Sequence, residues 1–369
     1  MRKLLLVIGL ALTGMTNAFA YDFQTTVNDV EMQFTITSSE EGMYGYPEVE
    51  LTKVLGNPEK VVLPKTVNRN ILFITTGTYA ITSIGTNAFA PENGEFSNLS
   101  SFEVEKGSYL TKICARAFNE CVNLRIFPVW NNLENIVADA FTGSGIEEFA
   151  EPEGCRNTYK AQGQCLVDRD TETRVMVFAP KAGPVVLNEK VNKIEAYAAS
   201  CSDAKTPLKV VFTCPGPITI AARAFSQSSL VALQCTNGGY LDEIEQGAFE
   251  HCFGFYRIKF DGGHWPKISE QAFSNSNITV IESTTMEPNS ISSAFIAPQD
   301  RYTSEKAYLL VPNGAKKNYV DAGYGNKFVI YEDTSGSDNV GNVGGEDVNG
   351  DGKVNATDVM QIYNYILSH

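Results

Sequence analysis

The sequence predicts a β-rich solenoid, a right-handed coil of stacked repeats with parallel strands. Seven segments share one pattern: an apolar residue, two variable residues, Ile, then four residues ending in Ala, usually followed by Phe. The isoleucines of this pattern are Ile84, Ile113, Ile136, Ile194, Ile220, Ile244 and Ile268. Their spacings are 29, 23, 58, 26, 24 and 24 residues, so the repeat has a period near 24 and one gap of about two periods. Such a period is typical of a solenoid coil.

A second apolar patch follows each Ala-Phe pair, as in CFGFYRIKF from Cys252, and alternates like a strand. Because one coil cannot bury its own apolar stripe, it must stack on its neighbours. We therefore expect residues 81–283 to form stacked coils with one parallel sheet and the seven isoleucines buried in register. Ala199 replaces the expected Phe and Pro217 the expected aliphatic residue, which predicts local distortion of those two coils.

The segments ITSIGTNAF from Ile81, LTKICARAF from Leu110 and LDEIEQGAF from Leu241 resemble the BspA-like leucine-rich repeat family. The resemblance covers roughly residues 21–333. It implies an N-terminal β cap over 21–70, a repeat domain over 71–285 with a β-hairpin inserted near 155–185, and a C-terminal cap over 286–333. It also implies a secreted or surface-displayed protein that binds protein or matrix, often in adhesion, without catalysis.

The first twenty residues read as a cleavable signal peptide, with Arg2 and Lys3 before a short apolar core and Ala18-Phe19-Ala20 at the cut. We expect a secreted or cell-surface protein, with the periplasm as the alternative, and no membrane span. The formal charge of −14 disfavours nucleic acid as a partner. Of the eight cysteines, Cys121 and Cys252 fall at one repeat position and predict buried apolar sites, whereas Cys155 and Cys165 form the most plausible disulfide.

The segment DVNGDGKVNATD, residues 347–358, matches the spacing of a twelve-residue calcium loop. The expected Ca²⁺ ligands are Asp347, Asn349, Asp351, Lys353 through its carbonyl, Asn355 and Asp358. Asp at the last position and the following apolar-faced helix resemble a dockerin, but residues 347–369 hold one loop where dockerins have two. By resemblance, Ala356 and Thr357 would contact a cohesin-like or anchoring partner. A Gly/Ser/Asn-rich linker over 334–346 predicts a flexible connection.

The outward positions of the second strands predict an extended binding face for a protein, matrix or glycan ligand. Its residues are Ser101, Glu103, Glu105, Glu148, Val210, Phe212, Gln234, Arg257, Lys259, Asp261, Val280 and Glu282. This face would be acidic in its first half, apolar in the middle at Val210 and Phe212, and basic near its far end. Exposed apolar neighbours indicate a contact surface. The alternative is a solvated sheet surface without a partner.

No catalytic motif is found, and His251, His264 and His369 have no spacing typical of metal ligands. We therefore expect no enzyme. The rival hypothesis is an accessory or catalytic component of a carbohydrate-degrading system recruited through the dockerin-like tail. Such an enzyme needs a concave site with two carboxylates and sugar-stacking aromatic residues.

Overall fold

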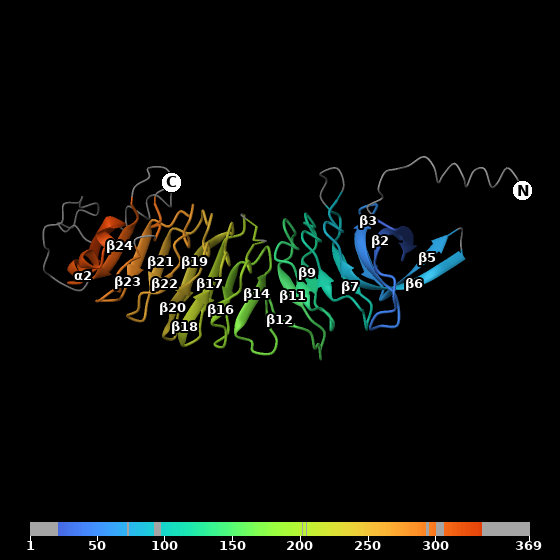
Figure 1. Ribbon diagram of the computed structural model, residues 1–369, viewed down its shortest axis with the longest axis horizontal. Coiled ribbons are helices and arrows are strands. Elements are labelled where there is room, and N and C mark those ends of the chain that lie inside the picture. Colours follow the sequence, from blue (N-terminus) through green and yellow to red (C-terminus); the bar gives the residue numbers. More distant parts are fainter. Residues whose placement is uncertain are drawn as a thin grey trace, which may run out of the picture.

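The computed structural model describes residues 21–333, except 72–73, 92–96, 201, 204, 293–294 and 300–305. The molecule is an elongated solenoid with its capped ends far apart (Figure 1). The predicted signal peptide and the 334–369 segment, with the calcium loop, Ala356 and Thr357, lie outside the described residues. The predicted single parallel sheet is wrong, because each coil contributes strands to two separate rows.

The first row, called here the isoleucine row, carries the repeat isoleucines and consists of two sheets. The first sheet contains β1 (Phe23–Val27), β2 (Val30–Ser38), β3 (Glu48–Val54), β5 (Thr66–Ile71), β6 (Ile74–Ile84), β8 (Lys112–Ile113) and β10 (Asn135–Ile136). The second contains β12 (Tyr159–Gln162), β13 (Cys165–Asp168), β14 (Arg174–Phe178), β16 (Lys193–Ile194), β18 (Gly216–Ile220), β20 (Gly239–Ile244) and β22 (Lys267–Ile268).

The second row forms four small parallel sheets. Their strands are β4 (Lys60–Leu63) with β7 (Ser101–Val104); β9 (Ile126–Pro128) with β11 (Glu148–Ala150); β15 (Pro184–Val186), β17 (Leu208–Phe212) and β19 (Leu230–Cys235); and β21 (Arg257–Phe260), β23 (Val280–Ser283), β24 (Tyr308–Pro312) and β25 (Val329–Asp333). Helix α2 (Lys316–Asp321) and the short 3₁₀ helix η1 (Tyr324–Asn326) connect the last two strands.

The isoleucines pair in register along their row, Ile84 with Ile113 and Ile136, and Ile194 with Ile220, Ile244 and Ile268. Five of the seven are fully buried. Ile136 and Ile268 are only partly buried, because each lies on the last strand of its sheet and has no following strand over it.

A phenylalanine ladder fills the space between the rows. Its ring centroids lie 4.6 Å apart for Phe89 and Phe118, 5.8 Å for Phe225 and Phe249, and 5.6 Å for Phe249 and Phe273. The residue before the repeat Ala adopts a left-handed backbone in five coils, at Asn87, Arg116, Tyr197, Arg223 and Gly247. The alanine that follows is buried in each of these coils.

The distortion predicted at Ala199 and Pro217 is largely absent. The Ala199 N–H donates to the Ala224 carbonyl, as the Phe225 N–H does to the Ala248 carbonyl in the next coil. The ring centroids of Phe178 and Phe225 lie 6.0 Å apart, although the coil of Ala199 supplies no ring. Beside the exposed Pro217, the buried aliphatic position is taken by Ile218, which pairs with Leu241. A one-residue shift of register after Ile218 absorbs the difference.

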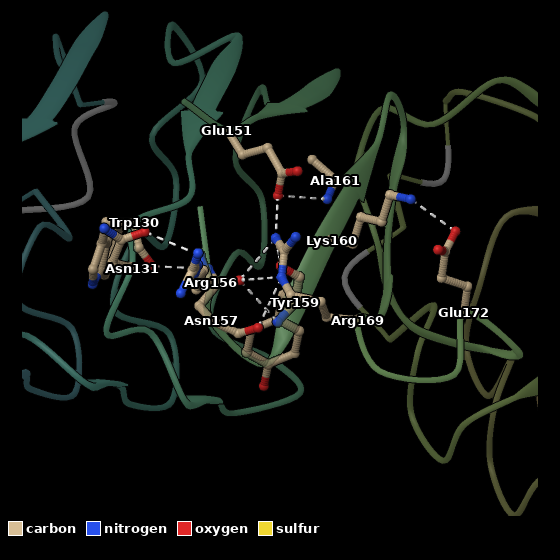
Figure 2. Close-up of polar contacts among 10 residues, drawn as sticks. All are labelled: Trp130, Asn131, Glu151, Arg156, Asn157, Tyr159, Lys160, Ala161, Arg169 and Glu172. Carbon is tan, nitrogen blue, oxygen red and sulfur yellow. Dashed lines mark hydrogen bonds and ion pairs between the residues drawn. The ribbon is translucent and has the colours of Figure 1, made fainter. Parts of the chain in front are cut away.

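The 58-residue gap holds three antiparallel strands, β12, β13 and β14, which interrupt the isoleucine row. Val175 on β14 then pairs with Ile194 and restarts it. No ladder hydrogen bonds join β10 to this insertion; instead, the Ile136 N–H donates to the Tyr159 hydroxyl at 3.0 Å. Arg169 lies at the centre of this junction and donates to Glu151 and to the Asn157 and Tyr159 carbonyls (Figure 2).

The described cysteines are free thiols. The predicted Cys155–Cys165 disulfide is therefore wrong. Cys121 and Cys252 are fully buried as predicted, and burial raises the pKa of each thiol to about 12. They occupy one repeat position, three residues after the ladder phenylalanine, where four other coils carry serine, such as Ser228. These cysteines thus have a packing role.

Candidate binding surface

The outward side of the second row is the surface on which the predicted binding residues fall. Glu103, Glu105, Glu148, Gln234 and Lys259 are exposed. Ser101, Arg257, Asp261 and Glu282 are partly exposed. Parallel register brings several of them side by side: Arg257 pairs with Val280, Lys259 with Glu282, and Glu148 with Ile126. We call this outward side the second-row face.

The expectation for Val210 and Phe212 is wrong. Both side chains are fully buried, together with Leu208, and they face the core from β17. The outward residues of that strand are Lys209 and Val211. The segment LKVVF offers apolar residues on both faces, so its pattern alone does not fix which alternate set points inward. Val280 is also buried, at 2% exposure, although its neighbour in register is Arg257.

An apolar middle nevertheless exists on the second-row face, carried by other residues. Val186 on β15 is 70% exposed and pairs in register with the partly exposed Val211, which in turn pairs with Gln234. Ile126 on β9 is 55% exposed. Sequence reasoning missed Val186 and Ile126; the signal was their place within the second apolar patches, where one of the alternating residues must point outward.

The basic residues predicted near the far end are paired with acids. Arg257 forms an ion pair with Glu282, and Lys259 with Asp261 at 2.8 Å. Near the other end, Lys60 lies 2.7 Å from Glu103, and this hydrogen bond lowers the pKa of the Glu103 carboxyl. The face therefore presents neutralised charge pairs at these places, and its far end is not a basic patch.

A hollow of about 490 Å³ lies between β19 and β21, where two small sheets of the second row adjoin without pairing. Gln234 and Cys235 line it from β19, Arg257 and Lys259 from β21, and Glu282 from β23. The hollow thus combines the Gln234 amide with the ion-paired Arg257 guanidinium and Glu282 carboxylate. It borders β19, which belongs to the same small sheet as the Val186–Val211 pair. It offers hydrogen-bond donors and acceptors to a polar ligand.

Two further hollows bear on the enzyme hypothesis. One, of about 530 Å³, includes His251 and Phe253 but no carboxylate, and the other, of about 560 Å³, includes Glu120 and Asp203 but no aromatic residue. In the hollow beside β19, Asp261 and Glu282 are bound in ion pairs and no aromatic side chain contributes. None of the three combines paired carboxylates with a sugar-stacking ring.

His251 adopts a left-handed backbone in the second turn of its coil, as Glu120, Gly143, Gln227 and Asn275 do in theirs. His264 Nε2 lies 3.0 Å from Asp242 Oδ1. Within the described part of the chain, no group of three His, Cys, Asp or Glu side chains is arranged to hold a metal ion. No helix in that part is long and apolar enough to cross a membrane.

The chain is similar to several known proteins. The model of the BspA type leucine rich repeat region matches six copies over residues 68–162 and 204–297, and the dockerin type I domain matches residues 345–369. Among solved structures, the pneumococcal vaccine antigen PcpA is 12% identical over 85% of this chain and 98% of its own, with a TM-score of 0.36. A leucine rich cell surface protein from Faecalibacterium prausnitzii A2-165 is 13% identical over 81% of this chain and 97% of its own, with a TM-score of 0.33.

No curated protein matches this chain. The repeat model covers more than half of the sequence, and its copies include the isoleucine and phenylalanine ladders that build both halves of the solenoid. The chain therefore belongs to the BspA type leucine-rich repeat family, and its residues 345–369 match the dockerin type I domain.

Proposed function

We propose that this protein is a secreted, non-catalytic surface protein that binds a protein or matrix ligand, including glycan, through the second-row face. The observation that supports this most directly is the Val186–Val211 pair. Val186 is 70% exposed on β15, an edge strand of a three-stranded sheet whose other side is the core. A solvated sheet needs no apolar side chain there, whereas an extended contact surface gains from one.

The ion pairs beside this apolar centre suit a contact surface as well. Arg257–Glu282 and Lys259–Asp261 border the hollow next to β19. Charges that are already paired are less costly to bury under a ligand than isolated ones. They would supply polar groups on one side of the apolar centre, beyond β19, as part of the rim of an interface does.

Ligand capture by variants tests this proposal. Immobilised matrix proteins and glycans are probed with the mature protein and with Val186→Ser/Val211→Ser. The expected result is at least a tenfold loss of capture, since about 1.5 kcal/mol or more is lost for each apolar contact removed. Met43→Ser is the matched control, because Met43 is 86% exposed on the loop after β2. Capture that is equal for both variants would remove the second-row face as the binding site.

We also propose that the dockerin domain attaches the protein to a cohesin-type partner. Its loop residues Asp347, Asn349, Asp351, Asn355 and Asp358 supply hard oxygen donors, with the Lys353 carbonyl, and such donors fit Ca²⁺. Bound calcium would hold the loop closed, and Ala356 and Thr357 would then be the contact residues for the partner. This dockerin match also favours a second candidate function, an accessory component of a carbohydrate-degrading system.

Calorimetric titration with calcium tests the tail. The mature protein should take up calcium in its loop, and Asp347→Ala/Asp351→Ala should take up one ion less. A cohesin pull-down with Ala356→Arg/Thr357→Arg, which leaves every proposed calcium ligand in place, separates docking from calcium binding. Equal calcium uptake by the wild type and the Asp variant would remove the site.

A further inference from the structure

The hollow of about 530 Å³ that includes His251 and Phe253 lies at the turns that precede β19 and β21. Two neighbouring coils supply most of its lining, and Pro207 contributes from the coil before them. Gln227 and His251 each follow the ladder phenylalanine of their coil by two residues, and Ser229 and Phe253 follow it by four. Because equivalent positions of stacked coils lie side by side, the hollow contains two neighbouring pairs, Gln227 with His251 and Ser229 with Phe253.

The repeat does not require the ring of Phe253. The equivalent residues of four other coils are Val122, Gly145, Ser229 and Asn277, and none of these is aromatic. The ladder phenylalanines are buried, whereas Phe253 is 42% exposed. The stacking of the coils therefore does not account for this ring, and its place on the lining of a hollow makes it accessible to a ligand.

Two contacts hold Phe253 in position. The side-chain amide of Asn277 donates to the Phe253 carbonyl at 2.8 Å, which ties the backbone at Phe253 to the following coil. The rings of His251 and Phe253 are inclined by 71°, with their centroids 5.7 Å apart. Groups that are already held in place lose less conformational freedom when a ligand binds.

The lining also contains a buried hydroxyl without a partner. Ser229 is 9% exposed, and its Oγ forms no hydrogen bond within the described part of the chain. The hydroxyl of Ser228, in contrast, accepts the Leu230 N–H. A buried hydroxyl that is left unpaired costs roughly 1–3 kcal/mol. A ligand group that forms a hydrogen bond with Ser229 would remove this cost.

The polarity of the lining indicates a neutral ligand. Among the described residues that line the hollow, none carries a carboxylate, an ammonium or a guanidinium group. The Glu250 carboxylate lies 4.0 Å from His251 Nε2 and is not part of the lining. The polar groups of the lining are the Gln227 amide, the serine hydroxyls and the His251 imidazole, and its main apolar groups are Val231 and Phe253. Such a lining suits a neutral molecule that has hydroxyl groups and an apolar face.

A sugar has this combination of groups. A pyranose ring carries hydroxyl groups around its edge and polarised C–H groups on its faces, and the negative face of an aromatic ring attracts such C–H groups. The volume of about 530 Å³ falls within the range of roughly 300–1,000 Å³ of small-molecule sites, whereas a stable protein interface buries roughly 800 Å² on each side. The size of the hollow thus favours a small ligand over a protein surface.

We propose that this hollow binds a neutral sugar unit. The Phe253 ring contacts the apolar face of the sugar, and Gln227, Ser229 and His251 bind its hydroxyl groups. The hollow shares only Val231 with the hollow between β19 and β21. The sugar site is therefore separate from the second-row face and does not rest on the function proposed for that face.

Titration of the mature protein with neutral tetrasaccharides tests this inference. Cellotetraose, maltotetraose and mannotetraose are each followed by saturation-transfer NMR, and at least one of them should bind saturably. Phe253→Ala should raise the dissociation constant at least tenfold, whereas Phe253→Tyr should retain binding. Ser229→Ala should raise it about fivefold without lowering the urea midpoint, because the hydroxyl has no partner to lose within the described part of the chain. The control is Tyr197→Ala, which removes an equally exposed ring, at 41%, from outside the hollow and should bind as the wild type does.

A fluorescence measurement locates the sugar. Trp130 and Trp265 are buried, so Phe253→Trp adds an exposed reporter whose emission should shift to the blue and be protected from acrylamide by the bound tetrasaccharide. Val186→Ser/Val211→Ser should bind sugar as the wild type does, which separates this site from the second-row face. Failure of all three tetrasaccharides to bind, equal binding by Phe253→Ala, or loss of sugar binding in Val186→Ser/Val211→Ser alone would each overturn the proposal. Capture of a protein through Phe253 in place of sugar would do so as well.

Discussion

Removal of the Arg169 side chain should separate the unfolding of the two halves of the solenoid. At the junction, the isoleucine row has no ladder hydrogen bonds between β10 and the insertion. Side-chain contacts (Figure 2) and a few main-chain hydrogen bonds, such as that from the Phe149 N–H to the Gly163 carbonyl at 2.8 Å, join the two parts instead. Arg169 donates to the Asn157 carbonyl at 2.9 Å, to the Asn157 Oδ1 at 3.1 Å, and to Glu151 and the Tyr159 carbonyl. Its side chain is only 21% exposed. The Arg169→Ala variant therefore removes the guanidinium donor from the Asn157 and Tyr159 carbonyls. Glu151 Oε2 and Asn157 Oδ1 still accept the Ala161 and Tyr159 N–H groups.

The magnitude follows from these contacts. One hydrogen bond to a charged group contributes about 1.5–3 kcal/mol, and contacts within one network are not additive. We expect the free energy of unfolding to fall by about 3 kcal/mol. The urea midpoint should then fall by about 1 M, if the free energy of unfolding decreases by about 3 kcal/mol for each molar of urea. The matched control is Arg125→Ala. Arg125 lies 2.8 Å from Glu147, but both side chains are more than half exposed, and such pairs contribute about 1 kcal/mol or less.

The assay uses the two tryptophans, since Trp130 precedes the junction and Trp265 follows it. Urea unfolding is followed in the Trp265→Phe background for the first half and in the Trp130→Phe background for the second. With Arg169 present the two transitions should coincide, and with Arg169→Ala they should separate, because a repeat array loses cooperativity where its interfaces weaken. Coincident transitions, with a midpoint no lower than that of Arg125→Ala, would refute this account of the junction.

Three further predictions concern the coils. Ile244→Asp should unfold the coils around β20, with loss of the cooperative urea transition, because it places an unpaired charge in a fully buried ladder position, and an unchanged midpoint would contradict the ladder. Gln227→Gly should raise the free energy of unfolding by up to about 1 kcal/mol, because Gln227 has a left-handed φ of 59° and the equivalent position of another coil is Gly143. The control is Gln234→Gly on the extended strand β19, which should lower the free energy of unfolding. The hydrogen bond from the Thr171 hydroxyl, with those from the Thr171 N–H and from Arg174, lowers the pKa of the Asp168 carboxyl. The contribution of Asp168 to stability is therefore present above the ordinary carboxyl pKa and is lost as pH falls through the lowered value. Asp168→Asn should weaken the acid dependence of unfolding measured below pH 4, and an identical dependence would contradict this.

The sequence by itself determined the repeat, its period and the residues that stack. A coil cannot bury its own stripe, so the recurring Ile, Ala and Phe had to form ladders along the stack, as Ile194, Ile220 and Ile244 do. Burial of Cys121 and Cys252 followed from the same logic, because equivalent positions in stacked coils share one environment. Calcium ligation by the tail was also read from local spacing and stays a prediction, since that loop lies outside the described residues.

Only the tertiary structure decided which residues reach the surface and which charges meet. Leu208, Val210 and Phe212 point inward while Val211 points outward, because the register with β15 and β19 selects one of two faces that the apolar run left equivalent. Arg257 and Glu282 pair across neighbouring coils, 25 residues apart, which removes the expected basic end of the binding face. The hollow beside Phe253 was equally invisible in the sequence, since its lining comes from three neighbouring coils that meet only when they stack.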